Sequence, residues 1–391
     1  MGQRERKNVF ITGGTGFVGD LLIKRYMQRT DCKLWVLSRA RNGISASDRI
    51  LSGIDNQYHG RIRVLEGDLG YGIDSNGNDN SAFLGLDNLN YKSNYELFLE
   101  MIEVVDEVFH NGSYLSLSRN NIEYQKCMDV NLMGTQRLLN LIGIFKKDLM
   151  ALYYTSTAFV HGIITEPDEF DEDNAYPTKW LNPYEESKWK AELLIRHSGH
   201  PFRIFRPGIV VSESGSGVFS NHSIYGIASL IKVGYCALKQ KKYNKPIRML
   251  VEGKPDSCHS FMLRDDLIEM IFDIMETNHS MNHVYNVINP DYATISDVLH
   301  AILYNLDPTV NFEYVPRIKK DYKLNPIEKI IKNKISPLFE GYLFKKSPVF
   351  KMDNVKAALG EDYLINRITH IDRQTLITII RDYFKIKSGQ N

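Results

Sequence analysis

Three residues in the middle of the chain have the types and spacing needed to reduce a carbonyl group. Tyr184 and Lys188 stand four apart in a helical segment, so they share one helix face, and Thr157 ends an apolar strand 27 residues before Tyr184. Hydride addition builds negative charge on the carbonyl oxygen, which needs a proton donor and a second hydrogen bond. Tyr184 can supply the proton and Thr157 the second bond, while a nearby Lys188 ammonium lowers the phenol's pKa. We therefore expect Thr157, Tyr184 and Lys188 to be the catalytic residues.

Glycines near the N-terminus indicate a dinucleotide site that could supply the hydride. The run "TGGTGFVG" follows the strand "KNVFIT" and precedes a helix expected from Phe17 to Gln28. Glycine lets the backbone approach a pyrophosphate, and a helix N-terminus presents free N–H groups and a positive dipole end. Three glycines alone are a weak signal, but here they lie in a strand, turn, helix, strand unit. We expect cofactor contacts at Thr12, Gly13, Thr15, Gly16, Phe17, Val18 and Gly19.

The end of the second strand distinguishes the two nicotinamide cofactors. A carboxylate there would hold the ribose 2′-hydroxyl and repel a 2′-phosphate. This chain reads "LSRAR" instead, so Ser38, Arg39 and Arg41 offer a hydroxyl and guanidinium groups suited to a phosphate. The alternative is that these arginines only cap a solvent-exposed turn. NADPH is therefore the expected cofactor, with Asp68 of "EGD" after the third strand placed to bind the adenine.

Alternating apolar segments predict an α/β fold with a doubly wound parallel sheet of the Rossmann type. A stretch rich in Gly, Asn, Asp and Ser, residues 71–90, is expected to be a surface excursion. The expected strands are residues 7–12, 33–38, 61–67, 107–110, 149–156 and 202–207, with 282–288 rejoining the sheet later.

The chain is long enough for one large core and a smaller attached lobe. From Gly208 onward the pattern loosens into mixed helices and short strands. We assign residues 1–215 to an NADP-binding Rossmann domain, rejoined by about 255–290. Residues 216–254 and 291–391 are assigned to a smaller, mixed substrate-binding lobe.

Composition excludes several classes of function. With 48 basic and 47 acidic residues, the formal charge of +1 provides no field toward nucleic acid or an anionic membrane. No apolar run approaches the roughly 20 residues of a membrane span, and the charged N-terminus is unlike a secretory signal. We therefore expect a cytoplasmic protein without a nucleic-acid partner. No disulfide framework or metal site is expected, because the four cysteines are scattered: Cys32, Cys127, Cys236 and Cys258.

Several segments resemble one branch of a known superfamily. They are "NVFITGGTGFVG", "GDLG", "VDEVFHNGS", "NLMGTQRLL", "YTSTAFVHG", "YEESKWKAE" and "RPGIV", within residues 8–215, and "SPLFEGYLFKKSPVFKMDN" near the C-terminus. Together they are similar to the thioester reductases and fatty acyl reductases of the extended short-chain dehydrogenase/reductase superfamily, a male-sterility-like NAD-binding branch. The superfamily's Ser/Thr, Tyr and Lys correspond to Thr157, Tyr184 and Lys188. The resemblance implies further cofactor contacts at Leu69, Asn111, Gly112, Ser113, Asn131, Tyr184, Lys188, Pro207, Gly208 and Ile209.

What the resemblance implies is NADPH-dependent release of an acyl chain from a carrier-protein or CoA thioester, as aldehyde or, after a second reduction, alcohol. The chain carries no adenylation or carrier domain of its own, so a phosphopantetheinyl carrier protein would be a separate partner. Two alternatives stay open: a short-chain reductase or epimerase acting on a sugar nucleotide or ketone, and a non-catalytic NADP-binding scaffold. The run "RPGIVV" after the sixth strand argues against a sugar nucleotide, and "SFMLRDDL", with Arg264, departs from the usual Pro-Val-Asp segment of acyl reductases.

The C-terminal part of the chain is rich in basic residues. A solvated helical face explains them, and a docking surface for an acidic carrier protein is the alternative. The residues are Arg317, Lys319, Lys320, Lys323, Lys329, Lys332, Lys334, Lys345 and Lys346.

Overall fold

The protein was analysed as a computed structural model. The residues that the structure describes are 7–70, 83–86, 92–163, 169–174, 177, 179–213, 215–220, 224–240, 247–343 and 346–388.

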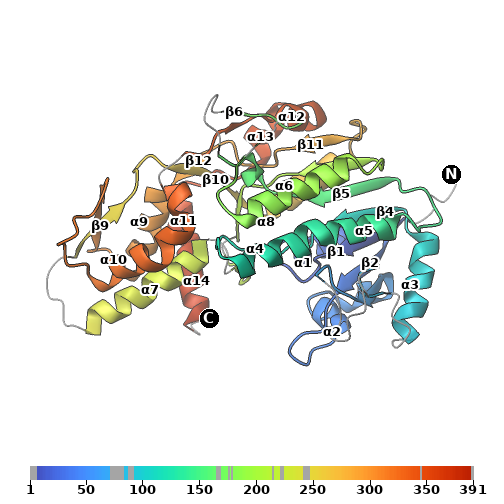
Figure 1. The fold of residues 1–391 in the computed structure, drawn as a ribbon, viewed down its shortest axis with the longest axis horizontal. Helices are drawn as coiled ribbons and strands as arrows, with labels where there is room; N and C mark the ends of the chain where they lie inside the picture. The colour runs from blue at the N-terminus through green and yellow to red at the C-terminus, as the bar shows by residue number, and fades with distance from the viewer. Residues whose placement is uncertain are drawn as a thin grey trace.

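A seven-stranded sheet forms the centre of the larger lobe, and every strand pair in it is parallel (Figure 1). The central strands are buried along their whole length, as expected where helices cover both faces. The expected Rossmann fold is therefore confirmed. In spatial order the strands are β11 (His283–Tyr285), β7 (Phe202–Phe205), β5 (Ala151–Thr155), β4 (Glu107–His110), β1 (Asn8–Thr12), β2 (Lys33–Ser38) and β3 (Ile62–Glu66).

Alternate side chains of the strands enter two separate cores. In β1, Val9 and Ile11 lie in one cluster, whereas Phe10 lies in the other. Each cluster combines side chains of the strands with side chains of the helices that cover the same face of the sheet. One face carries α1 (Gly19–Arg29), α2 (Ala46–Leu51), α8 (Arg264–Glu276) and α12 (Asp353–Leu359), and the other carries α3 (Lys92–Val104), α5 (Gly134–Ile142) and α6 (Pro183–Arg196).

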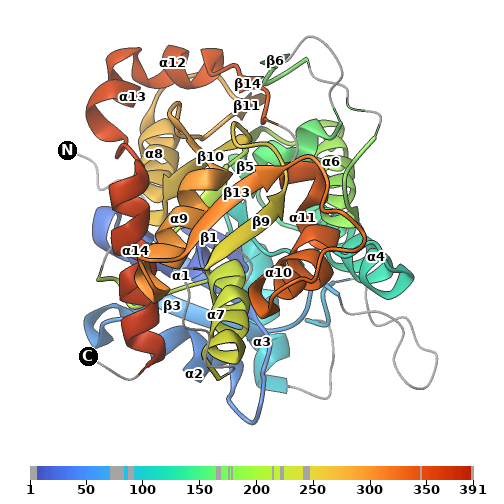
Figure 2. The same ribbon diagram turned by 90° about the vertical axis from the view of Figure 1, so that its left-hand side faces the viewer.

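A third core belongs to the smaller lobe, which Figure 2 turns toward the viewer. There β9 (Arg248–Glu252) and β13 (Asn311–Val315) pair in parallel. A three-stranded sheet of β8 (Ile209–Val211), β10 (Cys258–Leu263) and β12 (Tyr292–Thr294) lies between the lobes. Five helical segments surround this core: α7 (Ile224–Gln240), α9 (Ile295–Leu306), α10 (Pro326–Ile330) with its continuation η4 (Ile331–Ile335), α11 (Ser336–Leu343) and α14 (Arg373–Lys387).

The structure corrects two expectations about local structure. The first helix begins at Gly19 rather than Phe17. Most of the surface excursion expected at 71–90 lies outside the described residues, but its described piece, 83–86, is buried or half-buried rather than exposed. Leu84 and Leu86 are fully buried because they pack into the cluster that contains Leu37 and Phe98.

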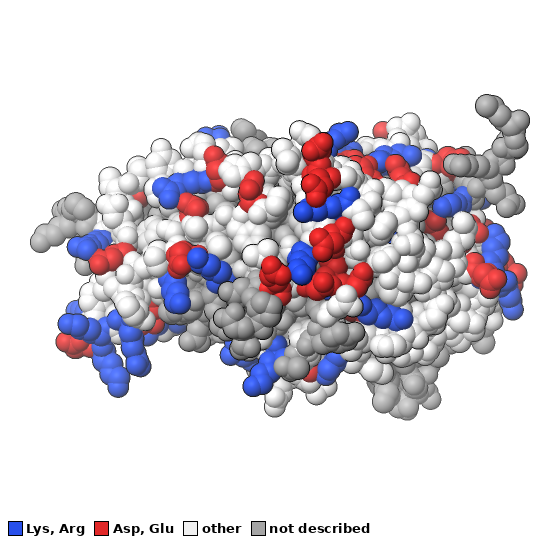
Figure 3. Space-filling view, turned by 90° about the horizontal axis from the view of Figure 1, so that it is seen from above, with Lys and Arg blue, Asp and Glu red and all other residues white. Residues whose placement is uncertain are grey.

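The long helical segment over residues 121–142 is interrupted by a wider turn. It consists of α4 (Asn121–Cys127), a π-helical turn η2 (Met128–Met133) and α5. On the face that Figure 3 shows, acidic and basic side chains are interspersed near the centre. Among the described residues, no helix has the length and apolar character that crossing a bilayer requires.

Candidate active site

The three expected catalytic residues lie at the carboxyl edge of the parallel sheet. Thr157 follows β5 directly and caps the short 3-10 helix η3 (Ala158–His161), with its hydroxyl accepting the N–H of Phe159 at 3.3 Å. Tyr184 and Lys188 lie on the first turns of α6. The glycine turn after β1 reaches the same edge, where ligands of open α/β sheets bind. The fold therefore gathers the residues that the sequence singled out.

Tyr184 is held as a neutral phenol beside Thr157. A hydrogen bond joins the two side chains and lowers the phenol's pKa, but burial raises this pKa above its ordinary value and is the larger effect. Pro183 occupies the start of α6, and the Asn182 side chain caps this helix by accepting the N–H of Glu185 at 3.1 Å. The Tyr184 phenol therefore keeps its proton at neutral pH.

Lys188 is buried one helical turn after Tyr184 on α6. Its Nζ donates to the carbonyl oxygen of Thr155 at 2.5 Å and lies 4.1 Å from the ring centre of Tyr154. Burial lowers its pKa to about 7, and the negative charge of Glu192 opposes this shift. The ammonium is thus easily lost near neutral pH.

Three buried hydroxyls next to this pair have no hydrogen-bond partner in the described part of the chain. They belong to Tyr154, Thr155 and Ser156, at the end of β5. Buried polar groups almost always have partners, so a group without one is typical of a site that takes a ligand or ordered water. The end of β5 therefore has unused hydrogen-bonding capacity for a bound ligand.

The glycine turn has the shape that a dinucleotide requires. Gly13 has a φ of 77°, and a Cβ there would lie 2.5 Å from the backbone nitrogen of Gly112. A Cβ on Gly19 would lie 2.0 Å from the carbonyl oxygen of Gly13. No side chain caps the N-terminus of α1 at Val18, so its N–H groups and dipole remain available to an anion. The residues present therefore fit the pyrophosphate of a dinucleotide.

Arg264 fastens the start of α1 to the rest of the protein. Its guanidinium is buried, donates to the carbonyl oxygen of Phe17 and to Asp20, each at 3.1 Å, and lies 5.2 Å from the Phe17 ring centre. The segment "SFMLRDDL", which departs from the acyl reductase pattern, thus supports the cofactor turn in this chain.

A buried hydrogen-bond chain joins β1, β4 and α5 behind the turn. The Thr12 hydroxyl accepts the N–H of Gly112 at 3.0 Å and lies 2.7 Å from Nδ1 of His110. Nε2 of His110 lies 2.9 Å from the hydroxyl of Thr135, which donates to the carbonyl oxygen of Asn131. Burial lowers the pKa of His110 to about 3, so the imidazole is neutral, and the chain requires its proton on Nε2. The Thr12 hydroxyl therefore makes its hydrogen bonds to other residues inside the protein.

Three guanidinium groups gather at the end of β2. Arg39 pairs with Asp68 at 3.0 Å, and Arg49 on α2 donates to the carbonyl oxygen of Arg39 at 2.5 Å and to the Thr15 hydroxyl at 3.2 Å. Burial and the positive charges of Arg39 and Arg41 lower the pKa of Arg49. The sequence analysis did not identify Arg49 as a phosphate-binding candidate, although it is the third arginine within a short stretch after this strand. Unlike these side chains, Ser38 is buried.

The remaining expected cofactor contacts line the same edge or support it. Asn111 donates to the Gly13 carbonyl oxygen at 3.3 Å. The Asn131 side chain is occupied by the backbone of Tyr114 and the hydroxyl of Ser187. Gly208 packs against Ser260, where a Cβ would lie 2.7 Å from the Ser260 carbonyl oxygen. Leu69 and Pro207 are buried, and Ile209 on β8 is half-buried. Gly16 in the glycine turn and Ser113 are exposed.

A residue from the smaller lobe reaches the start of the catalytic helix. The Tyr342 hydroxyl, on α11, donates to Glu185 and accepts from Asn182 at 2.7 Å. Glu185 also accepts the N–H of Leu181 at 2.9 Å, and burial raises its pKa to about 7. Asn182 followed three residues later by Glu185 resembles the capping-box pattern at a helix start. This pattern could have indicated the interaction of Asn182 with Glu185 from the sequence. No spacing pattern in the sequence indicated that Tyr342 lies here.

A small cleft opens between this tyrosine and the residues after Thr157. Its lining comes from both lobes: Phe159, His161, Gly162, Ile163, Leu181, His259, Gly341, Tyr342, Lys346, Ser347 and Pro348. Leu181 and Phe159 lie three and two residues from Tyr184 and Thr157 in the sequence, so this cleft lies near the candidate catalytic residues.

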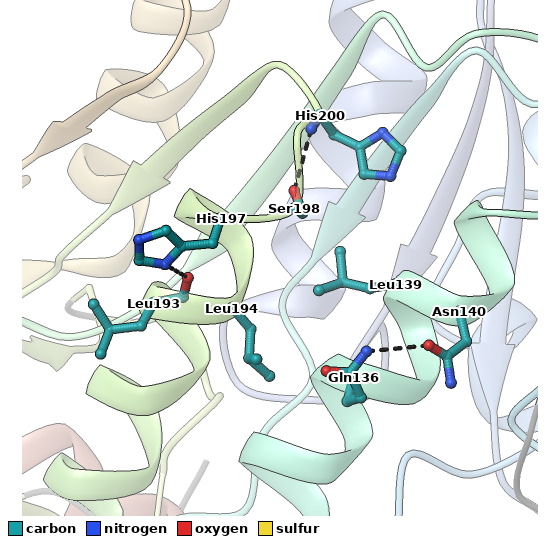
Figure 4. Close-up of a pocket in the computed structure, with 8 residues that line it drawn as sticks. All are labelled: Gln136, Leu139, Asn140, Leu193, Leu194, His197, Ser198 and His200. Atoms are coloured by element: carbon teal, nitrogen blue, oxygen red, sulfur yellow. Dashed lines mark hydrogen bonds between the residues drawn. The ribbon is translucent and has the colours of Figure 1, made fainter.

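A second depression, of about 370 Å³, lies between α5 and α6 (Figure 4). Leu193, Leu194 and His197 line it at the end of α6, nine or more residues beyond Tyr184. This separation corresponds to roughly 14 Å along the helix. The depression therefore lies away from the candidate chemistry. Within the described ranges, no group of three or more His, Cys, Asp or Glu side chains is arranged to hold a metal ion.

Comparisons with known proteins agree with this geometry. Residues 11–250 match the family described as male sterility protein, an NAD-binding domain. A non-canonical nonribosomal peptide synthetase of Aspergillus campestris is 26% identical over 300 residues, 72% of this chain and 25% of that protein. The carboxylic acid reductase of Mycobacterium tuberculosis is 28% identical over 235 residues, 53% of this chain and 18% of the enzyme. The chain thus spans a quarter or less of the length of these relatives.

A solved structure supports the fold over the whole chain. The terminal R domain from the myxalamid PKS-NRPS pathway superposes with a TM-score of 0.71 at 18% identity, covering 99% of this chain and 92% of that domain. The family match covers more than half of the chain and includes the glycine turn, Thr157, Tyr184 and Lys188. The chain therefore belongs to the male sterility NAD-binding family and is an NAD(P)-dependent oxidoreductase with the extended short-chain dehydrogenase/reductase fold.

Proposed function

We propose that the protein uses NADPH to reduce an acyl thioester on a phosphopantetheinyl carrier protein, releasing an aldehyde or, after a second reduction, an alcohol. The observation that carries this proposal is the Tyr184 phenol, hydrogen-bonded to Thr157 beside Lys188, at the sheet edge that the glycine turn shares. Relatives named as a peptide synthetase and a carboxylic acid reductase support a thioester as substrate.

The cofactor would be held by residues of the sheet edge. The glycine turn and the uncapped start of α1 would bind the pyrophosphate, and Arg39, Arg41 and Arg49 the 2′-phosphate. Tyr184 and Lys188 would contact the nicotinamide ribose. Bound there, NADPH supplies the hydride for the acyl carbon.

The chain's own residues stabilise and protonate the oxygen. Thr157 and Tyr184 both donate hydrogen bonds to the thioester carbonyl oxygen, which becomes negative as the carbon is reduced. Tyr184 then gives its proton to this oxygen, forming a hemithioacetal. The Lys188 ammonium favours that transfer by stabilising the phenolate left behind. Collapse of the hemithioacetal releases aldehyde and free thiol.

Consumption of NADPH with a panel of substrates tests this function. The panel contains octanoyl-pantetheine, octanoyl-CoA, an octanoyl carrier protein, a sugar nucleotide and a ketone. We expect oxidation with the thioesters alone. Turnover of the sugar nucleotide or the ketone alone would identify another short-chain enzyme, and tight NADPH binding without any turnover would identify a scaffold.

Arginine substitutions at the end of β2 test the choice of cofactor. Arg39→Ala and Arg49→Ala should each weaken NADPH binding about tenfold or more, because a charge-assisted hydrogen bond to the phosphate is lost. NADH, which lacks this phosphate, should bind within about twofold of wild type. Fluorescence titration with both cofactors measures this, and Arg63→Ala on β3 is the control. Equal losses for NADPH and NADH would refute the phosphate assignment.

The pH dependence of reduction tests the role of Lys188. Its pKa lies at about 7, so the ammonium is present below this pH and is lost as pH rises. We therefore expect kcat/KM to fall as pH increases through about 7, measured between about pH 5 and pH 9. Glu185 also titrates near 7, and Glu185→Gln should retain the falling limb. A limb that disappears in this variant would assign the titration to Glu185 instead.

A further inference from the structure

A group of exposed cations covers one side of the smaller lobe. We define the basic face as Arg317, Lys319, Lys320, Lys323, Lys329, Lys332 and Lys334, all of them exposed. Neighbouring cations behave differently, because Lys239, Arg248 and Lys346 each pair with a carboxylate. Within the described part of the chain, no residue of the basic face has an ion-pair partner. In Figure 3, basic side chains protrude at the end of the molecule that the smaller lobe forms.

The charge of this segment contrasts with that of the whole protein. Residues 316–335 contain seven Lys or Arg and two Asp or Glu, whereas the entire chain has a formal charge of only +1. One of the two acids, Glu328, is buried and accepts the N–H groups of Leu250 and Asn325. Asp321 is therefore the one exposed acid in this segment. A localised field of this kind steers a partner of opposite charge.

Helix packing directs the charges outward. Ile327, Ile331 and Ile335 follow one another every four residues and enter the core of the smaller lobe. This apolar stripe packs α10 and η4 against α7. Lys329 and Lys332 lie on the opposite, exposed side of the same helical segment. The core therefore fixes the position of the cations without using their charge.

The same helical segment leads to the catalytic residues. From Lys334, η4 continues directly into α11, and Tyr342 is eight residues further along, roughly 12 Å at the ordinary helical rise. Tyr342 contacts Asn182 and Glu185 at the start of the catalytic helix. Gly341 approaches Leu181 so closely that a Cβ would lie 2.6 Å from that side chain. A partner bound to the basic face would thus be separated from the cleft near Tyr184 by about the length of α11.

We propose that the basic face is the docking surface for an acidic carrier protein, whose phosphopantetheine arm extends along α11 into the cleft beside Tyr184. The inference rests on the proposed function and adds the surface that recognises the partner. An extended arm suits this geometry, because the cations lie outside the cleft while the reacting carbonyl must reach Tyr184. Recognition is electrostatic, so it governs association rather than the chemical step.

Charge reversal on the helical part of the face provides the test. The variant is Lys329→Glu/Lys332→Glu/Lys334→Glu, and the probe is an acidic acyl carrier protein loaded with octanoyl-phosphopantetheine. We expect kcat/KM for this carrier to fall about tenfold or more through KM, with octanoyl-pantetheine reduced at the wild-type rate. Raising salt from about 50 to about 300 mM should weaken the wild type far more than the variant.

A matched variant controls for net charge. Lys33→Glu/Lys146→Glu/Lys356→Glu changes the charge equally at exposed lysines away from the basic face and should retain wild-type kinetics with both substrates. Equal losses in the two triple variants, or unchanged kinetics after reversal on the face, would overturn the docking proposal. Reduction of free and carrier-bound octanoyl thioesters with equal KM would also overturn it.

A binding measurement separates docking from catalysis. Fluorescence anisotropy of the labelled carrier should show binding to the wild type and a Kd about tenfold or more weaker for the basic-face variant. If the carrier binds in this way but no thioester is reduced, the proposed function fails and the docking surface stands. If thioesters are reduced and binding ignores the charge reversal, the docking surface fails and the function stands.

Discussion

Tyr184→Phe is expected to lower kcat for thioester reduction by about 10²- to 10⁴-fold, the usual contribution of a positioned general acid. The substitution removes the phenolic proton and the hydrogen bond with Thr157 but keeps the ring. The carbonyl oxygen would then develop negative charge with one donor instead of two. Because the ring and the cap of α6 remain, binding of NADPH should weaken much less, by no more than about tenfold, the effect of one lost hydrogen bond to the ribose.

Single-turnover kinetics and cofactor titration measure these two quantities separately. Tyr363→Phe is a suitable control, since the Tyr363 hydroxyl also makes a side-chain hydrogen bond, donating to Asp273 on α8 at 2.7 Å. Both residues are far in the sequence from Thr157 and Tyr184. This control should leave kcat unchanged. A decrease of less than about tenfold for Tyr184→Phe would show that another group provides the proton.

Removal of Glu192 is expected to destabilise the protein more than any surface substitution. Both oxygens of Glu192 accept from Arg206, at 2.7 and 3.0 Å, and both side chains are fully buried. Arg206 also donates to the carbonyl oxygens of Asp171 and Glu172 and lies over the Phe170 ring at 4.9 Å. Glu192→Leu leaves a buried guanidinium unpaired, which costs about 3–5 kcal/mol.

Urea unfolding of matched variants measures this cost. Glu186→Leu on the same helix breaks a partly exposed pair with Lys190 and should change the free energy of unfolding by less than about 1 kcal/mol. The double variant Glu192→Leu/Arg206→Met should be more stable than Glu192→Leu, because neither charge remains buried. A double variant no more stable than the single one would show that the residues stabilise the fold by packing rather than by their charges.

The pair matters for the site because it anchors α6. Glu192 lies on this helix one turn beyond Lys188, and Arg206 follows β7 next to the expected cofactor residue Pro207. Loss of the pair would loosen Tyr184 and Lys188 together. Reduced activity of Glu192→Leu should therefore accompany its reduced stability.

Much of the larger lobe was predictable because its signals are local. A buried parallel strand is an uninterrupted apolar run, and a glycine turn between such a run and a helix is visible within a dozen residues. The strand at His283–Tyr285 was predicted in the same way, and it adds to the sheet beside β7. The helix start at Phe17 was wrong by two residues, because helix ends depend on how the first turn packs.

Other features could not be predicted, because their partners are far apart in the sequence. Arg49 reaches Thr15 only after α2 folds back over the end of β2. Tyr342 contacts Glu185 across 157 positions of the chain. Leu84 and Leu86 lie in a segment whose polar composition indicated a surface excursion, yet they are buried by contacts with other elements.

The sequence by itself determined the sheet and the glycine turn, and it singled out Thr157, Tyr184 and Lys188 as candidate catalytic residues, because periodicity and short-range spacing express these features. Only the tertiary structure decided which arginines meet at the end of β2 and how the smaller lobe reaches α6. It also decided that the residues of the basic face have no ion-pair partner in the described part of the chain, whereas Lys346 pairs with Asp256. The reason is physical: these arrangements depend on which surfaces pack together across the fold, and no local pattern of residues specifies the partner of a surface.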